Sequence, residues 1–365
     1  TTDGTFFNTG DYVTVVEGGF SYKVATSGDV TNAGGIQLDV LGGSPLEDDI
    51  AISALAFGVV GDWDGSTGTD NTAAMTAAHA TGKVIHYPSG RYRFSTLSMS
   101  TGGIVGVGKA TIFDSSDTTA GSVISYTGGD NTGLLVNELG AVFRDFYLRV
   151  NTTSQKPSGA GIDVNPGTIN ENYSSIVSNV TVRNIPTSVS FKNSSFFTIE
   201  NCYFSFYSVH GVYMDSNVVA FQDNGDTGIV NNWFFTTQPS AIGIKYRGGG
   251  GRILNNKINQ GQIGIDVSPL RDSSIVLIES NTIELQTVAN IRFTTEGDAV
   301  AANFSQLAII GNQLNATNGG SAIQFTPTAY VLKTLAITGN IIHFGTDLAN
   351  AIDLRNVQGF TITGN

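Results

Sequence analysis

Four carboxylate side chains are concentrated in one part of the sequence: Glu200, Asp215, Asp223 and Asp226. Enzymes that hydrolyse glycosides use two carboxyl groups, about 5–5.5 Å apart when the configuration is retained and about 6.5–9.5 Å apart when it is inverted. One group protonates the leaving oxygen, and the other can activate water. Aspartate is also an ordinary turn residue, so each of the four has a structural explanation as well. The sequence therefore predicts that a catalytic pair, if present, is drawn from these four.

A second set of side chains would suit a different reaction on a glycan. His210 and Tyr213 are close in the sequence, and either type of side chain can take the proton alpha to a uronate carboxylate in a lyase. Arg183, Lys192 or Lys245 would then have to neutralise the carboxylate of the substrate. A lyase reaction therefore stays open beside hydrolysis.

A repeated phrase shows which elements must position these residues. Isoleucine is followed three positions later by asparagine, and two positions after that by an apolar residue. The six asparagines, spaced by 24, 25, 31, 28 and 25 residues, are Asn232, Asn256, Asn281, Asn312, Asn340 and Asn365. Weaker copies carry Cys202, Val180 and Phe146 in the asparagine position. A second phrase alternates with the first and has the period of two that is typical of short, half-buried strands.

Short strands that repeat about every 25 residues, without helices between them, predict an all-β solenoid. In such a parallel β-helix, each strand pairs with its counterpart one turn later. A side-chain amide has two N–H donors and an acceptor oxygen, and neighbouring rungs lie ~4.8 Å apart. Each asparagine can therefore bond the asparagine of the next rung. The repeat predicts a ladder of asparagines at one bend of the coil.

The residue directly after each ladder position is expected to point outward. This column holds Tyr203 and Trp233 on adjacent rungs and Lys257 on the next. Exposed aromatic rings suit sugars, because the apolar faces of sugars pack on rings while their hydroxyls stay hydrated. We expect Tyr203, Trp233, Lys257, Tyr213 and His210 to contact a glycan. The alternative is that a long loop or another subunit covers the two rings.

The same repeats give an expected register for other acidic residues. Glu279 and Glu284 flank one ladder position and form a second candidate pair, although the bend between them can point them apart. Glu200 and Glu279 fall in one column three rungs apart, about 14 Å, which is too far for a catalytic pair. In the outward column of the second strand, the repeat places Gly243 beside Tyr213.

Residues 57–113 carry a series of short motifs. They read Phe57-Gly-Val-Val-Gly61-Asp62, Asp70-Asn-Thr-Ala-Ala-Met75, Val84-Ile-His-Tyr-Pro88-Ser-Gly90 and Ile104-Val-Gly106-Val-Gly108. This order resembles the N-terminal signature of the pectate-lyase-like superfamily, as found in bacteriophage tailspikes, roughly FGAxGDGxxDDTxAI, VxxPxGxY and IxGxG. The sequence departs from that pattern by an insertion around Trp63–Gly68 and by Asn71 in place of a second aspartate.

The resemblance implies a right-handed parallel β-helix over residues 51–365, closed by a short N-terminal capping helix. Asp70 is the expected N-cap of a helix through Ala73–Ala80, and Gly82 its expected end. Residues 1–50 are expected to form a small N-terminal β segment, which in tailspikes connects toward the virion. Because the sequence stops at Asn365 in mid-rung, we expect a longer native protein. The resemblance to tailspikes implies a homotrimer.

Composition excludes several classes of partner and site. The formal net charge of −12 argues against nucleic acid, and no apolar run approaches the ~18 residues that span a membrane. The single cysteine excludes an internal disulfide. The four histidines lack metal-ligand spacing, so no metal or cofactor is expected. The negative charge also favours a neutral or mildly charged glycan over a polyanionic one.

These observations and the resemblance together predict a tailspike-like depolymerase. It would be an extracellular protein of a virion tail, attached through its N-terminal side, that recognises the host. It would bind bacterial capsular or O-antigen polysaccharide and cleave it as an endo-acting glycoside hydrolase. The alternatives are a non-catalytic glycan-binding adhesin or fibre, and a polysaccharide lyase or a carbohydrate epimerase on the same fold.

Overall fold

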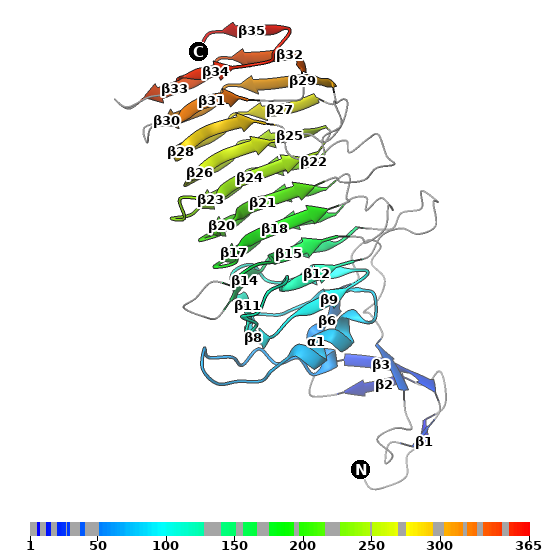
Figure 1. The fold of residues 1–365 in the computed structure, drawn as a ribbon. Helices are drawn as coiled ribbons and strands as arrows, with labels where there is room; N and C mark the ends of the chain where they lie inside the picture. The colour runs from blue at the N-terminus through cyan, green and yellow to red at the C-terminus, as the bar shows by residue number, and fades with distance from the viewer. Residues whose placement is uncertain are drawn as a thin grey trace.

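The computed structural model (Figure 1) describes residues 51–127, 140–150, 156–165, 175–192, 197–215, 227–248, 250–268, 275–294, 303–316, 320–326, 331–344 and 350–365. It also gives the backbone of five N-terminal strands. Two of them, β1 (Phe6–Phe7) and β4 (Gly28–Asp29), pair antiparallel. The other three form an antiparallel sheet of β2 (Tyr12–Val15), β3 (Phe20–Thr26) and β5 (Gln37–Val40). The predicted small N-terminal β segment therefore has the expected strands.

From residue 52 onward the chain is a right-handed parallel β-helix, as predicted. One long sheet has twelve parallel strands, one from each rung. They are β6 (Ile52–Ser53), β7 (Val84–His86), β10 (Gly103–Val105), β13 (Val142–Arg144), β16 (Ile176–Ser178), β19 (Thr198–Glu200), β22 (Thr227–Val230), β25 (Gly251–Leu254), β27 (Ile275–Glu279), β29 (Asn303–Ile310), β32 (Val331–Thr338) and β35 (Phe360–Thr363).

The second long sheet has eighteen strands and forms two stacks, because most rungs contribute two strands to it. The first stack is β8 (Gly90–Phe94), β11 (Thr111–Ser115), β14 (Tyr147–Val150), β17 (Thr181–Arg183), β20 (Tyr203–Ser205), β23 (Trp233–Phe235), β26 (Lys257–Val267), β28 (Thr282–Phe293), β30 (Gln313–Ala316) and β33 (Ile341–Phe344). The second is β9 (Leu97–Met99), β12 (Ile124–Tyr126), β15 (Ala160–Val164), β18 (Thr187–Lys192), β21 (His210–Asp215), β24 (Ile242–Arg247), β31 (Ser321–Phe325) and β34 (Ile352–Leu354). The long strands β26 and β28 run through both stacks.

The core fills the inside of the coil with stacked apolar side chains. Alternate residues of each strand point inward, so Ile253, Ile278, Ile309 and Ile337 lie in register on successive rungs and are buried. Because equivalent residues stack one above another, the outward side chains also form columns. A functional site on this fold is therefore built from neighbouring rungs.

The predicted asparagine ladder is present at the bend between the first sheet and the first stack. The side-chain amide of each ladder asparagine from Asn232 to Asn340 donates to the Oδ1 of the next, over 2.8–3.0 Å. The same oxygens accept the backbone N–H of the previous ladder residue. Buried polar groups of the bend are thereby paired.

Cys202 continues the ladder toward the N-terminus without an amide. Its backbone N–H donates to Asn232 Oδ1 over 2.9 Å, and its Sγ accepts the N–H of Val180 over 3.5 Å. Burial raises the pKa of the thiol to about 12, so the group stays protonated. Cys202 is therefore a structural member of the bend.

The residue before each ladder position adopts the left-handed conformation. On nine successive rungs its φ lies between 53° and 64°. Glycine and asparagine adopt this conformation most readily. The nine residues are Asp145, Asn179, Asn201, Asn231, Asn255, Ser280, Gly311, Gly339 and Gly364. They turn the chain sharply enough for the next side chain to enter the ladder.

The capping helix α1 (Thr72–His79) covers the first rungs beside the 3₁₀ turn η1 (Ala54–Phe57). The prediction of Asp70 as the N-cap was wrong by one position, because the N-cap is Asn71. Asp70 instead accepts bonds from the N–H and hydroxyl of Thr72. The Asn71 side chain is fully buried and bonds the N–H and the carbonyl of Val60. Gly82, at φ +70°, follows the helix as predicted.

His79 makes this cap sensitive to acid. Its ring is buried in α1 and hydrogen-bonds the Tyr87 hydroxyl over 3.0 Å, and burial lowers the pKa of His79 from 6.5 to about 4. Between these two pH values the unfolded chain thus binds more protons than the folded one. The free energy of unfolding is therefore not lowered by His79 above pH 6.5, and it decreases as the pH falls toward 4. The loss is expected to reach about 3 kcal/mol.

Urea denaturation at pH 7.5 and pH 4.5 measures this dependence. His79→Gln should flatten it, whereas the exposed His343→Gln should leave it unchanged. An equal pH dependence in the His79→Gln variant and the wild type would contradict the assignment to His79.

No helix in the described part of the chain is long and apolar enough to cross a bilayer.

Candidate functional site

Two aromatic rings lie together on the outer face of the first stack. Tyr203 on β20 and Trp233 on β23 are paired in register, and their ring centroids are 5.2 Å apart at an interplanar angle of 60°. Trp233 is 50% exposed. Lys257 follows on β26, with its Nζ 5.5 Å from the Trp233 ring centroid. The structure therefore brings together three of the five residues expected to contact a glycan.

The other two expected contact residues lie on the second stack of the same rung as Tyr203. The rings of His210 and Tyr213 stack with centroids 4.9 Å apart on β21. The Tyr213 hydroxyl donates to Asp215 Oδ2 over 2.6 Å. Arg247, on β24 of the next rung, donates to the same oxygen over 2.9 Å and to the Tyr213 hydroxyl over 3.3 Å. Asp215 is thus held in a cluster that spans two rungs.

The cluster holds Tyr213 in its protonated form. Burial, followed by the hydrogen bond to Asp215, raises the pKa of the phenol to about 12. A lyase in which Tyr213 takes a proton would need the deprotonated phenolate. At neutral pH this environment favours a role for Tyr213 in holding Asp215 over a role as the base.

The register of the second stack differs from the expected one at one rung. Tyr213 pairs with Lys245, not with Gly243. The repeat was misread there because Ile242 and Ile244 both fit the apolar slot, two residues apart. Lys245 donates to Asp266 Oδ2 over 2.7 Å.

Arg292 binds both oxygens of the same carboxylate, at 3.0 and 2.7 Å. Asp266 is fully buried, so Lys245, Asp266 and Arg292 form a charged network over three rungs of the second stack.

Of the three remaining predicted carboxylates, Glu200 is the one that the structure describes. Glu200 ends β19 in the twelve-stranded sheet and accepts a bond from Ser178 over 3.1 Å. Strands β20 and β21 separate it from Asp215 along the chain. Asp223 and Asp226, together with residues 216–226 as a whole, lie outside the described residues.

The second candidate pair is divided between the two sheets. Glu279 ends β27 in the twelve-stranded sheet, three rungs from Glu200 in the same column, as the repeat indicated. Glu284 lies on β28, where it accepts a bond from Asn259 over 3.2 Å. The bend at the ladder lies between them.

Sequence reasoning missed the role of Arg247. A signal was present, because Arg247 lies two residues beyond Lys245 on one strand and therefore on the same face. To infer from this that Arg247 contacts Asp215, the register between strands of neighbouring rungs must be known. Among the described residues, no three His, Cys, Asp or Glu side chains gather in a way that could hold a metal ion.

No protein-family model and no curated protein matches the sequence. Solved structures do match in fold. Tailspike protein 2 of an Escherichia coli O157:H7 bacteriophage is 14% identical with a TM-score of 0.60, over 94% of this chain. This chain spans only 45% of that full-length tailspike.

Two further structures have similar scores. The tailspike of Acinetobacter phage vB_ApiP_P1 is 14% identical with a TM-score of 0.55, over 97% of this chain and 69% of the tailspike. The A-module of an Azotobacter vinelandii mannuronan C-5 epimerase is 16% identical with a TM-score of 0.53, over 86% of this chain and 98% of the module. At such identities the likeness shows the fold alone: the chain has the right-handed parallel β-helix that these tailspikes and this epimerase share.

Proposed function

We propose that the protein is a tailspike-like depolymerase that binds and hydrolyses bacterial capsular or O-antigen polysaccharide. The observation that carries the proposal is the open column of Tyr203, Trp233 and Lys257 on the first stack. A half-exposed tryptophan beside a tyrosine offers apolar surface to a sugar ring, and the regular rung spacing suits a polymer. The fold shared with tailspikes supports this reading by analogy.

Asp215 is the described carboxylate that best fits a catalytic role. It lies on β21, in the same rung as Tyr203, and Tyr213 and Arg247 fix its orientation. Because two donors already bind it, we assign Asp215 the role of the charged partner that activates water. Asp223 or Asp226, which follow in the same connection, would supply the proton to the leaving oxygen. Glu200 is the next choice.

We further propose a homotrimer on a virion tail, attached through the N-terminal side, as the structural likeness to phage tailspikes suggests. A non-catalytic adhesin is the second candidate. The separation of Glu200 from Asp215 along the rung favours the adhesin, because a hydrolase needs two carboxyl groups close to each other.

A panel of purified capsular and O-antigen polysaccharides tests the function. New reducing ends, without the ultraviolet absorbance of an unsaturated uronate, are the expected result. Reducing ends together with that absorbance would replace hydrolysis by a lyase reaction. Binding without any new reducing end would favour the adhesin.

Trp233→Ala is expected to weaken binding of the glycan about tenfold, because it removes both the apolar surface of the ring and its contact with Tyr203. Affinity electrophoresis in gels that contain the polysaccharide measures the change. Ile341→Ala is a matched control: Ile341 is an exposed apolar residue in the same column, on β33. Equal losses in the two variants would show that the aromatic pair has no special role.

A further inference from the structure

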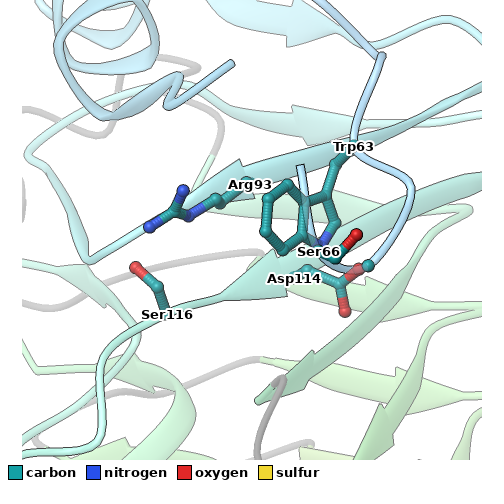
Figure 2. A pocket seen from close by; sticks show the side chains of 6 residues that line it. Trp63, Ser66, Arg93, Asp114 and Ser116 are labelled. Carbon is teal, nitrogen blue, oxygen red and sulfur yellow. The ribbon is translucent and has the colours of Figure 1, made fainter. Parts of the chain in front are cut away.

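A pocket of about 230 Å³ lies at the N-terminal end of the first stack, well apart from Asp215 along the coil. Its lining residues are Trp63, Gly65, Ser66, Arg93, Asp114 and Ser116 (Figure 2). Three of them come from the insertion around Trp63–Gly68, and the other three from β8, β11 and the residue that follows β11. The insertion thus builds one wall of the pocket.

Two side chains at the pocket offer only hydrogen-bond donors. Trp63 is 8% exposed, and its Nε1 is buried without a hydrogen-bond partner among the described residues. The guanidinium of Arg93 lies over the Trp63 ring, 4.8 Å from the centroid. It forms no salt bridge or hydrogen bond with any residue that the structure describes. A buried donor without an acceptor is unfavourable, so a ligand oxygen would supply the acceptor that the pocket lacks.

The carboxylate in the pocket wall does not compensate these donors. Asp114 is fully buried and forms salt bridges with Arg91 and Arg149. A Cβ at Gly65 would meet Arg91 NH1 at 2.9 Å, so this guanidinium also lies close beneath the insertion. Arg91 and Arg149 therefore balance the charge of Asp114, and Arg93 is the arginine that lines the pocket.

The acidic residues of the insertion and the segment after it are engaged within their own loop. Asp62 accepts bonds from Thr69, Asp64 from Ser66 and Thr67, and Asp70 from Thr72. None of these three carboxylates lines the pocket. Hydrogen bonds from Thr72 lower the pKa of Asp70, and the attraction between its charge and Arg93 contributes to the same shift. No hydrogen bond joins the Arg93 guanidinium or Trp63 Nε1 to these three carboxylates, so both groups keep donors for a ligand.

The two serines complement these donors with acceptors. The Ser66 hydroxyl donates to Asp64 Oδ1 over 2.9 Å, and the Ser116 hydroxyl donates to the carbonyl of Phe94 over 3.1 Å. Each hydroxyl oxygen still has lone pairs that can accept a bond. The pocket thus suits a ligand that carries an anionic, acceptor-only group next to hydroxyl donors.

A basic and aromatic face leads from this pocket to the Tyr203–Trp233 pair. In the column of Asp114, the next rungs carry Arg149 and Arg183. The Arg149 guanidinium lies 5.6 Å from the Tyr147 ring centroid, and that of Arg183 lies 4.8 Å from the Phe206 ring centroid.

The rung of Asp114 lies three rungs below that of Tyr203, a distance of about 14 Å. A polysaccharide chain that lies along the first stack can reach both places at once.

We propose that the Trp63–Arg93 pocket binds the carboxylate of an acidic sugar, a uronic acid or a comparable sugar acid, in the polysaccharide. The claim that this sugar belongs to the cleaved polymer rests on the proposed function, whereas binding of the free sugar does not. The sugar carboxylate accepts from Arg93 and Trp63, and the ring hydroxyls donate to the serines. The overall charge of −12 repels acidic glycans, so the local arginines give the attraction that the rest of the surface lacks.

The chain offers a direct reporter, because Trp63 and Trp233 are its two tryptophans. In the Trp233→Phe variant, tryptophan fluorescence, excited selectively so that the tyrosines do not contribute, comes from Trp63 alone. Titration with D-glucuronate is expected to change this emission in a saturable way, and D-glucose is not. Arg93→Gln in the same background should abolish the response, whereas Arg355→Gln, at an exposed arginine near the C-terminal end, should leave it unchanged.

Several results would overturn the proposal. They are no response to glucuronate, a response that survives Arg93→Gln, and an equal response to inorganic phosphate, which would mark a general anion site. With polymers, Arg93→Gln in the full chain should weaken binding of an acidic polysaccharide about tenfold and leave a neutral one unaffected.

The two proposals can fail separately. Glucuronate binding at Trp63 without cleavage of any polysaccharide would reject the depolymerase and keep the pocket. Cleavage of a polysaccharide without a Trp63 response to glucuronate would reject the pocket and keep the depolymerase.

Discussion

Asp215→Asn is expected to lower the rate of polysaccharide cleavage about 10³-fold, the scale of a lost general base. Asparagine has nearly the same shape, and its Oδ1 can still accept from Tyr213 and Arg247, so the cluster should keep its geometry. What is lost is the charge that activates water. The measurement is the rate of new reducing ends on the polysaccharide that the panel identifies.

Asp353→Asn is the matched control for this experiment. Asp353 also lies on the second stack and pairs with an arginine, Arg355, over 3.1 Å. It should retain wild-type activity. If Asp215→Asn keeps more than half of the wild-type rate while its circular dichroism is unchanged, Asp215 is not part of the catalytic pair, and Glu200, Asp223 and Asp226 become the candidates.

Asn281→Ala is expected to lower the free energy of unfolding by about 3–5 kcal/mol. The Asn281 amide donates to Asn312 Oδ1, to the Ile253 carbonyl and to the Glu279 carbonyl, over 2.9–3.1 Å. Its Oδ1 accepts from the backbone and the side chain of Asn256. All these groups lie at a bend where the side chain is fully buried, so water cannot easily replace the lost partner.

Urea denaturation followed by circular dichroism measures the loss. Asn255→Gly removes an exposed asparagine amide, which donates to Asn231 Oδ1 over 2.6 Å at a place where water can take over the bond. Glycine also tolerates the left-handed φ of 53° at this position, so the change should cost less than about 1 kcal/mol. Similar losses at the two positions would mean that the ladder does not act through burial. Thr282→Ala is a second control. Thr282 directly follows Asn281 in the chain and points outward, so this variant measures the general effect of an alanine at the start of β28.

The solenoid could be predicted from the sequence because its signal is repeated. Isoleucine and asparagine recur at a fixed spacing, and each copy supports the same assignment, so Cys202 could be placed in the ladder without an amide. The residues with left-handed backbone conformation also form a repeated pattern in the sequence. Asn231, Asn255, Ser280 and Gly311 are examples, and each directly precedes a ladder residue. This pattern passed unnoticed because these residue types are common in any turn.

The candidate site was less predictable because it depends on contacts between rungs. A strand with Ile242 and Ile244 both apolar allows two registers that differ by two residues, and both keep the same face inward. The choice between them decides whether Gly243 or Lys245 lies beside Tyr213. Charged pairs such as Arg247 with Asp215 follow from that register, and the sequence alone does not contain it.

The Trp63 pocket was hidden for a different reason. The insertion around Trp63–Gly68 was visible only as a departure from a family pattern, which says where residues are added but not what they contact. Its relation to Arg93 depends on how the loop folds back over β8 and β11. Loops that cross several rungs carry no repeat to guide a prediction.

The asparagine ladder also has a direction. From Asn232 to Asn365, each side-chain link runs from the amide of one rung to the oxygen of the next, so the amide dipoles align along the coil. Loss of ammonia from one amide during ageing leaves a carboxylate, which can still accept from the rung before but cannot donate to the rung after. Chemical damage at Asn281 would therefore open the coil on its Asn312 side, while the contact with Asn256 is kept.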